Sequence, residues 1–199
     1  MTDRETIAWY DAAAARYAQG RRVPPRHLDA FMACLPAGGA VLDLGCGGGQ
    51  ATAALAEAGF AVTGLDASAG LLDLARQAAP AARFIQADFA ALDTMVPPAS
   101  LDGLWANFAL LHAPRGEMPG HLARIARVLR PGGAFHLALL LGSGEGRDRL
   151  GRFYTYYQAD ELHALLAAAG FTLLGESQGD SASAAGDPVR HIVLLARRA

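Results

Sequence analysis

The sequence lacks lysine altogether: all 17 basic residues are arginine, and the only adjacent pairs are Arg21-Arg22 and Arg197-Arg198. With a net charge of -2, the chain shows no basic cluster of the kind that binds nucleic acid or an anionic membrane surface. It also lacks an apolar run of about 18 residues, and its polar, acidic start has no signal-peptide pattern. We therefore expect a cytoplasmic protein with no nucleic-acid or membrane partner.

Cysteine is nearly absent as well. Cys34 and Cys46 are the only two, which excludes a disulfide framework and a zinc site of three or four thiolates. At 199 residues the chain is long enough for one α/β domain and too short for a second catalytic domain. We predict a single domain over residues 39–199, preceded by a helical segment over residues 1–38 that forms a lid.

Apolar runs alternate with helical patterns along most of the chain, which indicates a parallel sheet covered by helices. A helix over 70–78 is capped by Ser68, and Pro131-Gly132-Gly133 should end a helix over 120–129. After a helix over 160–169, two final strands over 171–176 and 191–196 flank a polar loop over 178–188. No helix joins these two strands, so they can pair only antiparallel. The earlier strands are expected at 40–44, 61–65, 83–86, 101–107 and 134–141.

A glycine cluster, Gly45-Cys46-Gly47-Gly48-Gly49, directly follows the first expected strand. Glycine permits a sharp turn that brings backbone N–H groups against a ligand, and a helix over 50–58 starts at the same spot. The dinucleotide fingerprint needs a sixth-position glycine, but that position is Gln50, which disfavours an NAD-linked oxidoreductase. Asp66 ends the second strand, where such folds place a ribose-binding carboxylate. An adenosine-containing ligand is therefore expected, with Cys46 as a small packing residue rather than a nucleophile.

Five motifs in order then resemble those of the class I S-adenosylmethionine-dependent methyltransferases, closest to the type 11 domain group. The resemblance implies a Rossmann-like α/β fold: a seven-stranded, mostly parallel sheet with an antiparallel last strand and helices on both faces. It also implies S-adenosylmethionine as the cofactor and direct methyl transfer to a small molecule. The motifs are Asp43-Leu44-Gly45-Cys46-Gly47, Asp66-Ala67-Ser68, Ala87-Asp88-Phe89, the segment from Asn107 to His112, and Leu129-Arg130-Pro131-Gly132-Gly133.

The same resemblance implies a set of cofactor contacts. Asp66 would bind the ribose hydroxyls and Asp88-Phe89 the adenine, whereas Asp43 either contacts the ligand or holds the loop through backbone N–H groups. No carboxylate occurs in 108–114, so no metal is expected and activity should survive chelators. The full set of implied cofactor contacts is Tyr17, Asp43, Gly45, Cys46, Gly47, Asp66, Ala67, Leu71, Asp88, Phe89, Asn107 and Phe108.

The acceptor side is less defined. His112, after the 101–107 strand, is the candidate base if the acceptor is a hydroxyl, and a cofactor contact or a backbone-bonded loop residue otherwise. Arg147 lies in a glycine-rich loop over 142–149, and Tyr154 and Tyr157 follow that loop. With Tyr10, they are predicted to line the acceptor pocket, although the aromatics could equally serve packing. The other five histidines are given no role. The acceptor atom and the oligomeric state stay open, and a non-catalytic S-adenosylmethionine-binding protein remains the alternative.

Overall fold

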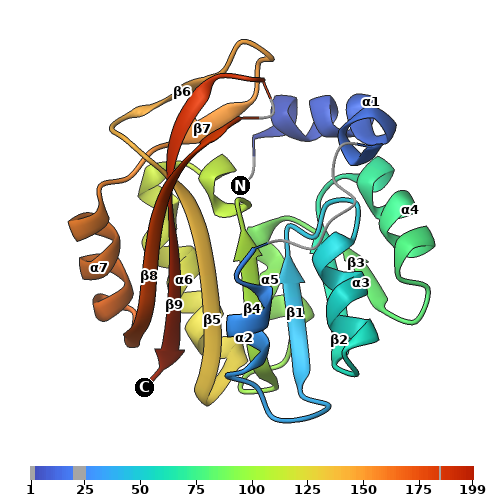
Figure 1. Cartoon of the computed structure of the whole chain (residues 1–199), viewed down its shortest axis with the longest axis vertical. Coiled ribbons are helices and arrows are strands. Elements are labelled where there is room, and N and C mark those ends of the chain that lie inside the picture. Colours follow the sequence, from blue (N-terminus) through green and yellow to red (C-terminus); the bar gives the residue numbers. More distant parts are fainter. Residues whose placement is uncertain (1–2, 20–25, 184) are drawn as a thin grey trace.

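The computed structural model describes residues 3–19, 26–183 and 185–199, and its centre is a seven-stranded sheet with helices on both faces (Figure 1). The strand order is β3-β2-β1-β4-β5-β9-β8. The first five strands are parallel, and β9 lies antiparallel between β5 and β8, which confirms the predicted Rossmann-like sheet. The strands are β1 Ala40–Leu44, β2 Ala61–Asp66, β3 Arg83–Gln86, β4 Leu101–Asn107, β5 Leu129–Leu141, β8 Phe171–Ala182 and β9 Pro188–Arg198.

The core forms on both faces because side chains alternate along each strand. On β4, Trp105 packs with residues of α2 and α3, whereas its neighbour Leu104 packs with residues of α6 and α7. Ser68 caps α4 by accepting a hydrogen bond from the Leu71 N–H, as predicted. The helices are α1 Arg4–Gln19, α2 Leu28–Met32, α3 Gln50–Glu57, α4 Ala69–Ala78, α5 Leu92–Met95, α6 Met118–Val128 and α7 Ala159–Ala168, with 3-10 turns η1 Phe89–Ala91, η2 Leu110–His112 and η3 Arg115–Glu117.

Two predicted boundaries are wrong. Strand β5 begins at Leu129, so Pro131-Gly132-Gly133 lies inside its first part, where the pairing with β4 shifts register between Leu101 and Gly103. The expected polar loop 178–188 belongs largely to the β8–β9 hairpin, because β8 continues to Ala182 and β9 begins at Pro188. Its polar side chains are mostly exposed, and an edge strand accepts polar residues because solvent reaches it.

A small antiparallel hairpin that the sequence did not predict, β6 Glu145–Arg147 with β7 Phe153–Thr155, lies with α1 beyond the C-terminal ends of the central strands (Figure 1). The Phe153 N–H donates to Thr6 Oγ1 at 2.8 Å, and Arg147 pairs with Asp3 at 2.8 Å, so the hairpin is joined directly to α1. On its other side, Asp11 accepts from the Ser68 hydroxyl at 2.6 Å, which joins α1 to the start of α4. These contacts fix α1 over the sheet edge. That residues 1–38 act as a lid stays a prediction.

Candidate functional site

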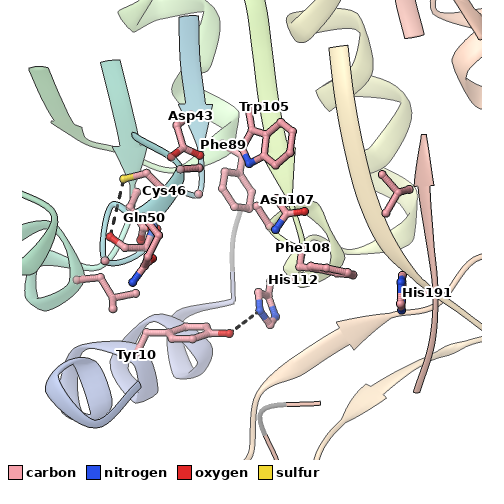
Figure 2. Close-up of a pocket in the computed structure, with 18 of the residues that line it drawn as sticks. Tyr10, Asp43, Cys46, Gln50, Phe89, Trp105, Asn107, Phe108, His112 and His191 are labelled. Carbon is pink, nitrogen blue, oxygen red and sulfur yellow. Dashed lines mark hydrogen bonds between the residues drawn. The ribbon is translucent and has the colours of Figure 1, made fainter. Parts of the chain in front are cut away.

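A cavity of about 560 Å³ lies at the C-terminal edge of the central strands, beneath α1 (Figure 2). One wall, here named the loop side, consists of the β1–α3 loop, Asp66, Ala67 and Leu71. The opposite wall, named the β9 side, consists of Arg26, His27, Phe108, Asp180, Ser181, His191 and Val193. Tyr10, Phe89, Asn107 and His112 lie between the two walls.

The β1–α3 loop depends on glycine at positions with positive φ. Gly45 has φ +71°, and a Cβ there would lie 2.4 Å from the Ala109 Cβ, so both conformation and space exclude a larger residue. The N–H groups of Gly45 and Cys46 both donate to the Leu65 carbonyl, at 2.7 and 3.1 Å, which ties the loop to β2. Gly47 also has positive φ, but a Cβ there would meet nothing within 4 Å. The loop therefore presents bare backbone to the cavity.

Asp66 holds this loop from the end of β2. Its Oδ2 accepts from the Gly47 N–H and its Oδ1 from the Ser68 N–H, both at 2.9 Å. Burial raises the pKa of this carboxyl, and the backbone N–H bonds oppose the rise. A carboxylate oxygen can accept more than one hydrogen bond, so Asp66 can also receive ligand hydroxyls at the cavity wall.

Asp43 lies buried behind the loop and accepts from the Thr52 hydroxyl at 2.7 Å, which connects β1 to α3. Burial raises the pKa of Asp43 to about 7, against the lowering effect of the Thr52 hydrogen bond. The adjacent Cys46 is buried too, and burial together with the charges of Asp43 and Asp66 raises the pKa of its thiol well above the ordinary value. A thiol that stays protonated at neutral pH is a poor nucleophile, in keeping with the packing role predicted for Cys46.

The predicted adenine pair divides in the structure. Phe89 is buried and lines the cavity, whereas Asp88 is not among the lining residues. Asp88 Oδ1 instead accepts from the Ala90 N–H at 2.8 Å and caps the short turn η1. The side chain of Tyr17, another predicted cofactor contact, lies outside the described residues. Every other predicted cofactor contact lines the cavity.

His112 has both ring nitrogens engaged. Its Nδ1 lies 2.6 Å from the Phe153 carbonyl oxygen, which can only accept, so Nδ1 carries the hydrogen. In the neutral ring Nε2 then accepts from the Tyr10 hydroxyl at 2.9 Å (Figure 2). Burial lowers the pKa of His112 to about 4, so the ring is neutral at neutral pH. For His112 to act as a base, Tyr10 would first have to release it.

Three residues predicted for the acceptor pocket do not line the cavity. Arg147 pairs with Asp3 and Glu5, Tyr154 is buried with its ring 4.8 Å from that of His112, and Tyr157 is fully buried beneath the Arg115 guanidinium. Tyr154 and Tyr157 are buried packing residues, and Arg147 instead joins β6 to the start of α1. Of that predicted set, Tyr10 alone reaches the cavity.

Behind Tyr10, Arg152 is a fully buried cation that the sequence did not single out. Its guanidinium bonds Asp148 at 2.6 Å, lies 4.6 Å from the centre of the Trp9 ring, and donates to the Tyr10 hydroxyl at 3.3 Å. Tyr10 and His112 are therefore backed by a compensated buried charge.

Sequence reasoning also missed much of the β9 side. Arg26 and His27 come from the turn before α2, Asp180 and Ser181 from a segment expected to be a loop, and His191 from an expected strand, where no spacing pattern marks a binding role. The lining residues not predicted are Thr6, Arg26, His27, Gly48, Gln50, Ala51, Trp105, Ala109, Asp180, Ser181, His191 and Val193.

Among the described residues, no group of three or more His, Cys, Asp or Glu side chains could hold a metal ion. None of the described helices is long and apolar enough to span a bilayer.

Residues 41–133 match a protein family described as a methyltransferase domain. The chain is 34% identical over 141 residues to malonyl-[acyl-carrier protein] O-methyltransferase of Enterobacter lignolyticus, covering 69% of this chain and 55% of that protein. It is 34% identical over 178 residues to trans-aconitate 2-methyltransferase of Deinococcus radiodurans, covering 88% and 64% respectively. The chain spans about half the length of the curated relatives it matches.

Among solved structures, the chain resembles 1,6-didemethyltoxoflavin-N1-methyltransferase of Burkholderia thailandensis, determined with 1,6-didemethyltoxoflavin and S-adenosylhomocysteine bound. The two chains are 26% identical with a TM-score of 0.75, over 98% of this chain and 88% of the other.

Proposed function

We propose that this chain, a class I S-adenosylmethionine-dependent methyltransferase, transfers a methyl group from that cofactor to a small molecule by direct displacement. The observation that carries the proposal is the joint position of the Gly45–Gly49 loop and the Asp66 carboxylate on one wall of the cavity. The relatives described above support it, since all of them are named as methyltransferases.

The loop side fits the cofactor by shape and by chemistry. Gly47 leaves open space where any side chain would project, and Asp66 keeps lone pairs for ribose hydroxyls. Phe89 offers an apolar wall for the adenine. Asp43 accepts from the Thr52 hydroxyl and joins β1 to α3, and it also lines the cavity, so both roles considered for it stay open.

When bound, the cofactor supplies a methyl group on a positively charged sulfur. The protein's own task is then to align the acceptor with that methyl group and to exclude water. Tyr10 and His112 close the cavity where α1 crosses it, and Phe108 narrows it from β4. His112 Nε2, the nitrogen that could accept a proton, is bonded to the Tyr10 hydroxyl, and burial lowers the pKa of the ring to about 4, so His112 is a weak base whose role is to position Tyr10.

Calorimetry with S-adenosylmethionine, S-adenosylhomocysteine and NAD tests the proposal. We expect the first two to bind and NAD not to bind. Asp66→Asn should weaken cofactor binding by about 1.5–3 kcal/mol, the range for hydrogen bonds to a charged group. Asp73→Asn is the matched control, because that carboxylate is 72% exposed on α4 and pairs only with Arg76. Equal affinity in both variants would remove Asp66 from the ribose site.

Release of S-adenosylhomocysteine during incubation with a pool of metabolites separates an enzyme from a protein that only binds the cofactor. Turnover of the cofactor that depends on an added metabolite is the expected result. Binding without such turnover would favour the non-catalytic alternative.

A further inference from the structure

The β9 side of the cavity is a separate recognition surface, built by residues that the loop side does not use. Three segments meet there: the turn before α2, the end of β4, and the β8–β9 hairpin. The His191 ring packs edge-on against Phe108 with ring centres 5.8 Å apart, and its Nδ1 lies 3.2 Å from the Ser181 hydroxyl. Figure 2 shows Phe108 and His191 facing the cavity across from Cys46 and Gln50.

Three basic side chains, Arg26, His27 and His191, line this wall. Burial, with smaller contributions from His27 and Arg26, lowers the pKa of His191, and Asp180 opposes this shift. Within the described part of the chain, Arg26 forms no ion pair and its side chain is exposed. Asp180 is the single acid of the β9 side; it is 85% exposed and lies 3.9 Å from Arg190. The wall therefore has the Arg26 guanidinium, which has no ion-pair partner among the described residues, beside two imidazole rings that can donate N–H bonds to an anion.

The backbone conformation of His27 supports a binding role for this wall. Its φ is +71°, a left-handed conformation that costs a non-glycine residue about 1–2 kcal/mol. His27 precedes α2 but makes no side-chain capping bond to it, so helix capping does not explain the strained conformation. The strained turn brings Arg26 and His27 to the cavity wall opposite the cofactor loop.

We propose that the methyl acceptor is a small carboxylic acid, and that Arg26, His27 and His191 bind its carboxylate. The inference rests on the proposed function and names its substrate class. The Arg26 guanidinium matches a carboxylate in charge and geometry, and a neutral imidazole can donate one N–H bond to a carboxylate oxygen.

A carboxylate also matches the chemistry of the site. It is already ionised at neutral pH, so one of its oxygens can attack without a base. That oxygen forms a new bond to the methyl carbon while the carbon–sulfur bond breaks and its electron pair stays on sulfur. No proton changes place, which agrees with a His112 that is neutral and bonded at both nitrogens. The ester product has lost one negative charge, so its attraction to Arg26 weakens and its release is favoured.

The test compares acids with their uncharged amides. Malonate, trans-aconitate and malonamide are titrated into the protein saturated with S-adenosylhomocysteine, with heat as the readout. In parallel, the acids are incubated with S-adenosylmethionine that carries a labelled methyl group. Methyl esters are then detected as labelled methanol, which mild alkali releases from them. We expect at least one of the acids to bind and to form an ester, and malonamide to do neither.

Glutamine variants of the site residues, each with a control at the same residue type elsewhere, identify the residues that bind the acid. Arg26→Gln and His191→Gln should each weaken acid binding and raise KM by about 10-fold or more, the size of a lost charge-assisted hydrogen bond. Arg127→Gln and His163→Gln are the controls, because Arg127 lies 60% exposed on α6 and His163 38% exposed on α7, away from the cavity. The affinity for S-adenosylhomocysteine should stay unchanged in all four variants.

The outcomes separate the two proposals. The carboxylate inference is wrong if S-adenosylhomocysteine binds but neither acid binds or is esterified. It is also wrong if only alcohols or amines are methylated. In both cases the methyltransferase proposal stands. If Arg26→Gln and His191→Gln bind the acids as the controls do, the assignment of this wall is wrong. If neither form of the cofactor binds, the proposed function fails and the inference fails with it.

Discussion

The loop side of the cavity and its cover, formed by α1 and the β6–β7 hairpin, are built in opposite ways. On the loop side, the geometry comes from the backbone of a few consecutive residues, with glycines at φ values that other residues avoid. In the cover, it comes from side chains that are distant in sequence: Tyr10 bonds His112 across 102 positions and Arg152 across 142. A short-range motif therefore meets a network of long-range contacts in one cavity.

The difference shows which kind of change each side tolerates. The loop side cannot accept a Cβ at Gly45 whatever its neighbours are, because the constraint lies in the chain itself. The cover formed by α1 and the β6–β7 hairpin depends on particular side-chain partners, so different partners would give a different pocket. Substitutions that address one side at a time test this contrast.

The largest effect is expected from Arg152→Ala, which breaks the cover. The Arg152 side chain is 1% exposed, and its loss would leave the Asp148 carboxylate, 9% exposed, without its bonded cation. Removing one partner of a buried pair costs about 3–5 kcal/mol, so the free energy of unfolding should fall by that amount in urea denaturation.

Arg149→Ala provides the control for Arg152→Ala. Arg149 lies in the same hairpin turn, but its side chain is 63% exposed and reaches Asp187 only at 3.6 Å. An exposed pair of this kind contributes about 0–1 kcal/mol. Equal losses in the two variants would show that Arg152 does not hold the cover together.

The next largest effect is expected from Gly45→Ala on the loop side. The new Cβ would lie 2.4 Å from the Ala109 Cβ at a φ of +71°, which combines overpacking with backbone strain. We expect the free energy of unfolding to fall by about 2–4 kcal/mol, and calorimetry to detect no cofactor binding. Gly59→Ala has positive φ but open space, so strain alone should cost about 1–2 kcal/mol and leave cofactor binding unchanged. A Gly45→Ala variant that bound the cofactor normally would contradict the backbone account of this side.

The smallest of the three effects concerns Asp43, beneath the loop, and depends on pH. Its pKa is about 7 in the folded protein against 3.8 as the ordinary value, so between these values the folded state binds the extra proton. The stability from this group is complete below pH 3.8 and is lost as the pH rises through 7. Asp43→Asn removes the buried charge and keeps an oxygen that can accept from Thr52. The variant should therefore gain about 1–3 kcal/mol relative to the native protein between pH 5 and pH 8.

The measurement for Asp43→Asn is urea denaturation of both proteins across that pH range. Burial lowers the pKa of His112 to about 4 and that of His136 to about 3. In acid these two rings therefore lower the stability of the folded protein, whereas Asp43 raises it. They are present in both proteins, so they cancel in the difference. Asp73→Asn, with its carboxylate on the surface of α4, should show no such trend. A flat difference for Asp43→Asn would mean that Asp43 is ionised in the folded state.

Prediction from sequence worked where a signal is local. The bounds of β1, β3 and β4 follow from short apolar runs, and the start of α4 follows from Ser68. It worked less well where solvent, not the interior, surrounds the strands. In β8 most residues are exposed and polar, so no apolar alternation marked it beyond the first residues.

Within the site, the same limit applies to charged residues. Arginine is seldom fully buried, so nothing in the chain singled out Arg152, and its burial depends on Asp148 and three aromatic rings. Arg147 and Tyr157 were predicted at the pocket because the segment follows β5. Instead, Arg147 of β6 pairs with Asp3, and Tyr157, which follows β7, is buried in the core.

The sequence by itself determined the parallel sheet, the glycine loop and the carboxylate after β2, because these depend on apolar periodicity and on backbone conformations that few residues adopt. Only the tertiary structure decided which side chains close the cavity and which line its β9 side. Those side chains come from α1, the turn before α2, the end of β4, η2 and the β8–β9 hairpin, and their contacts span most of the chain. No local sequence pattern predicts these contacts, because each depends on how separate elements pack against the same edge of the sheet.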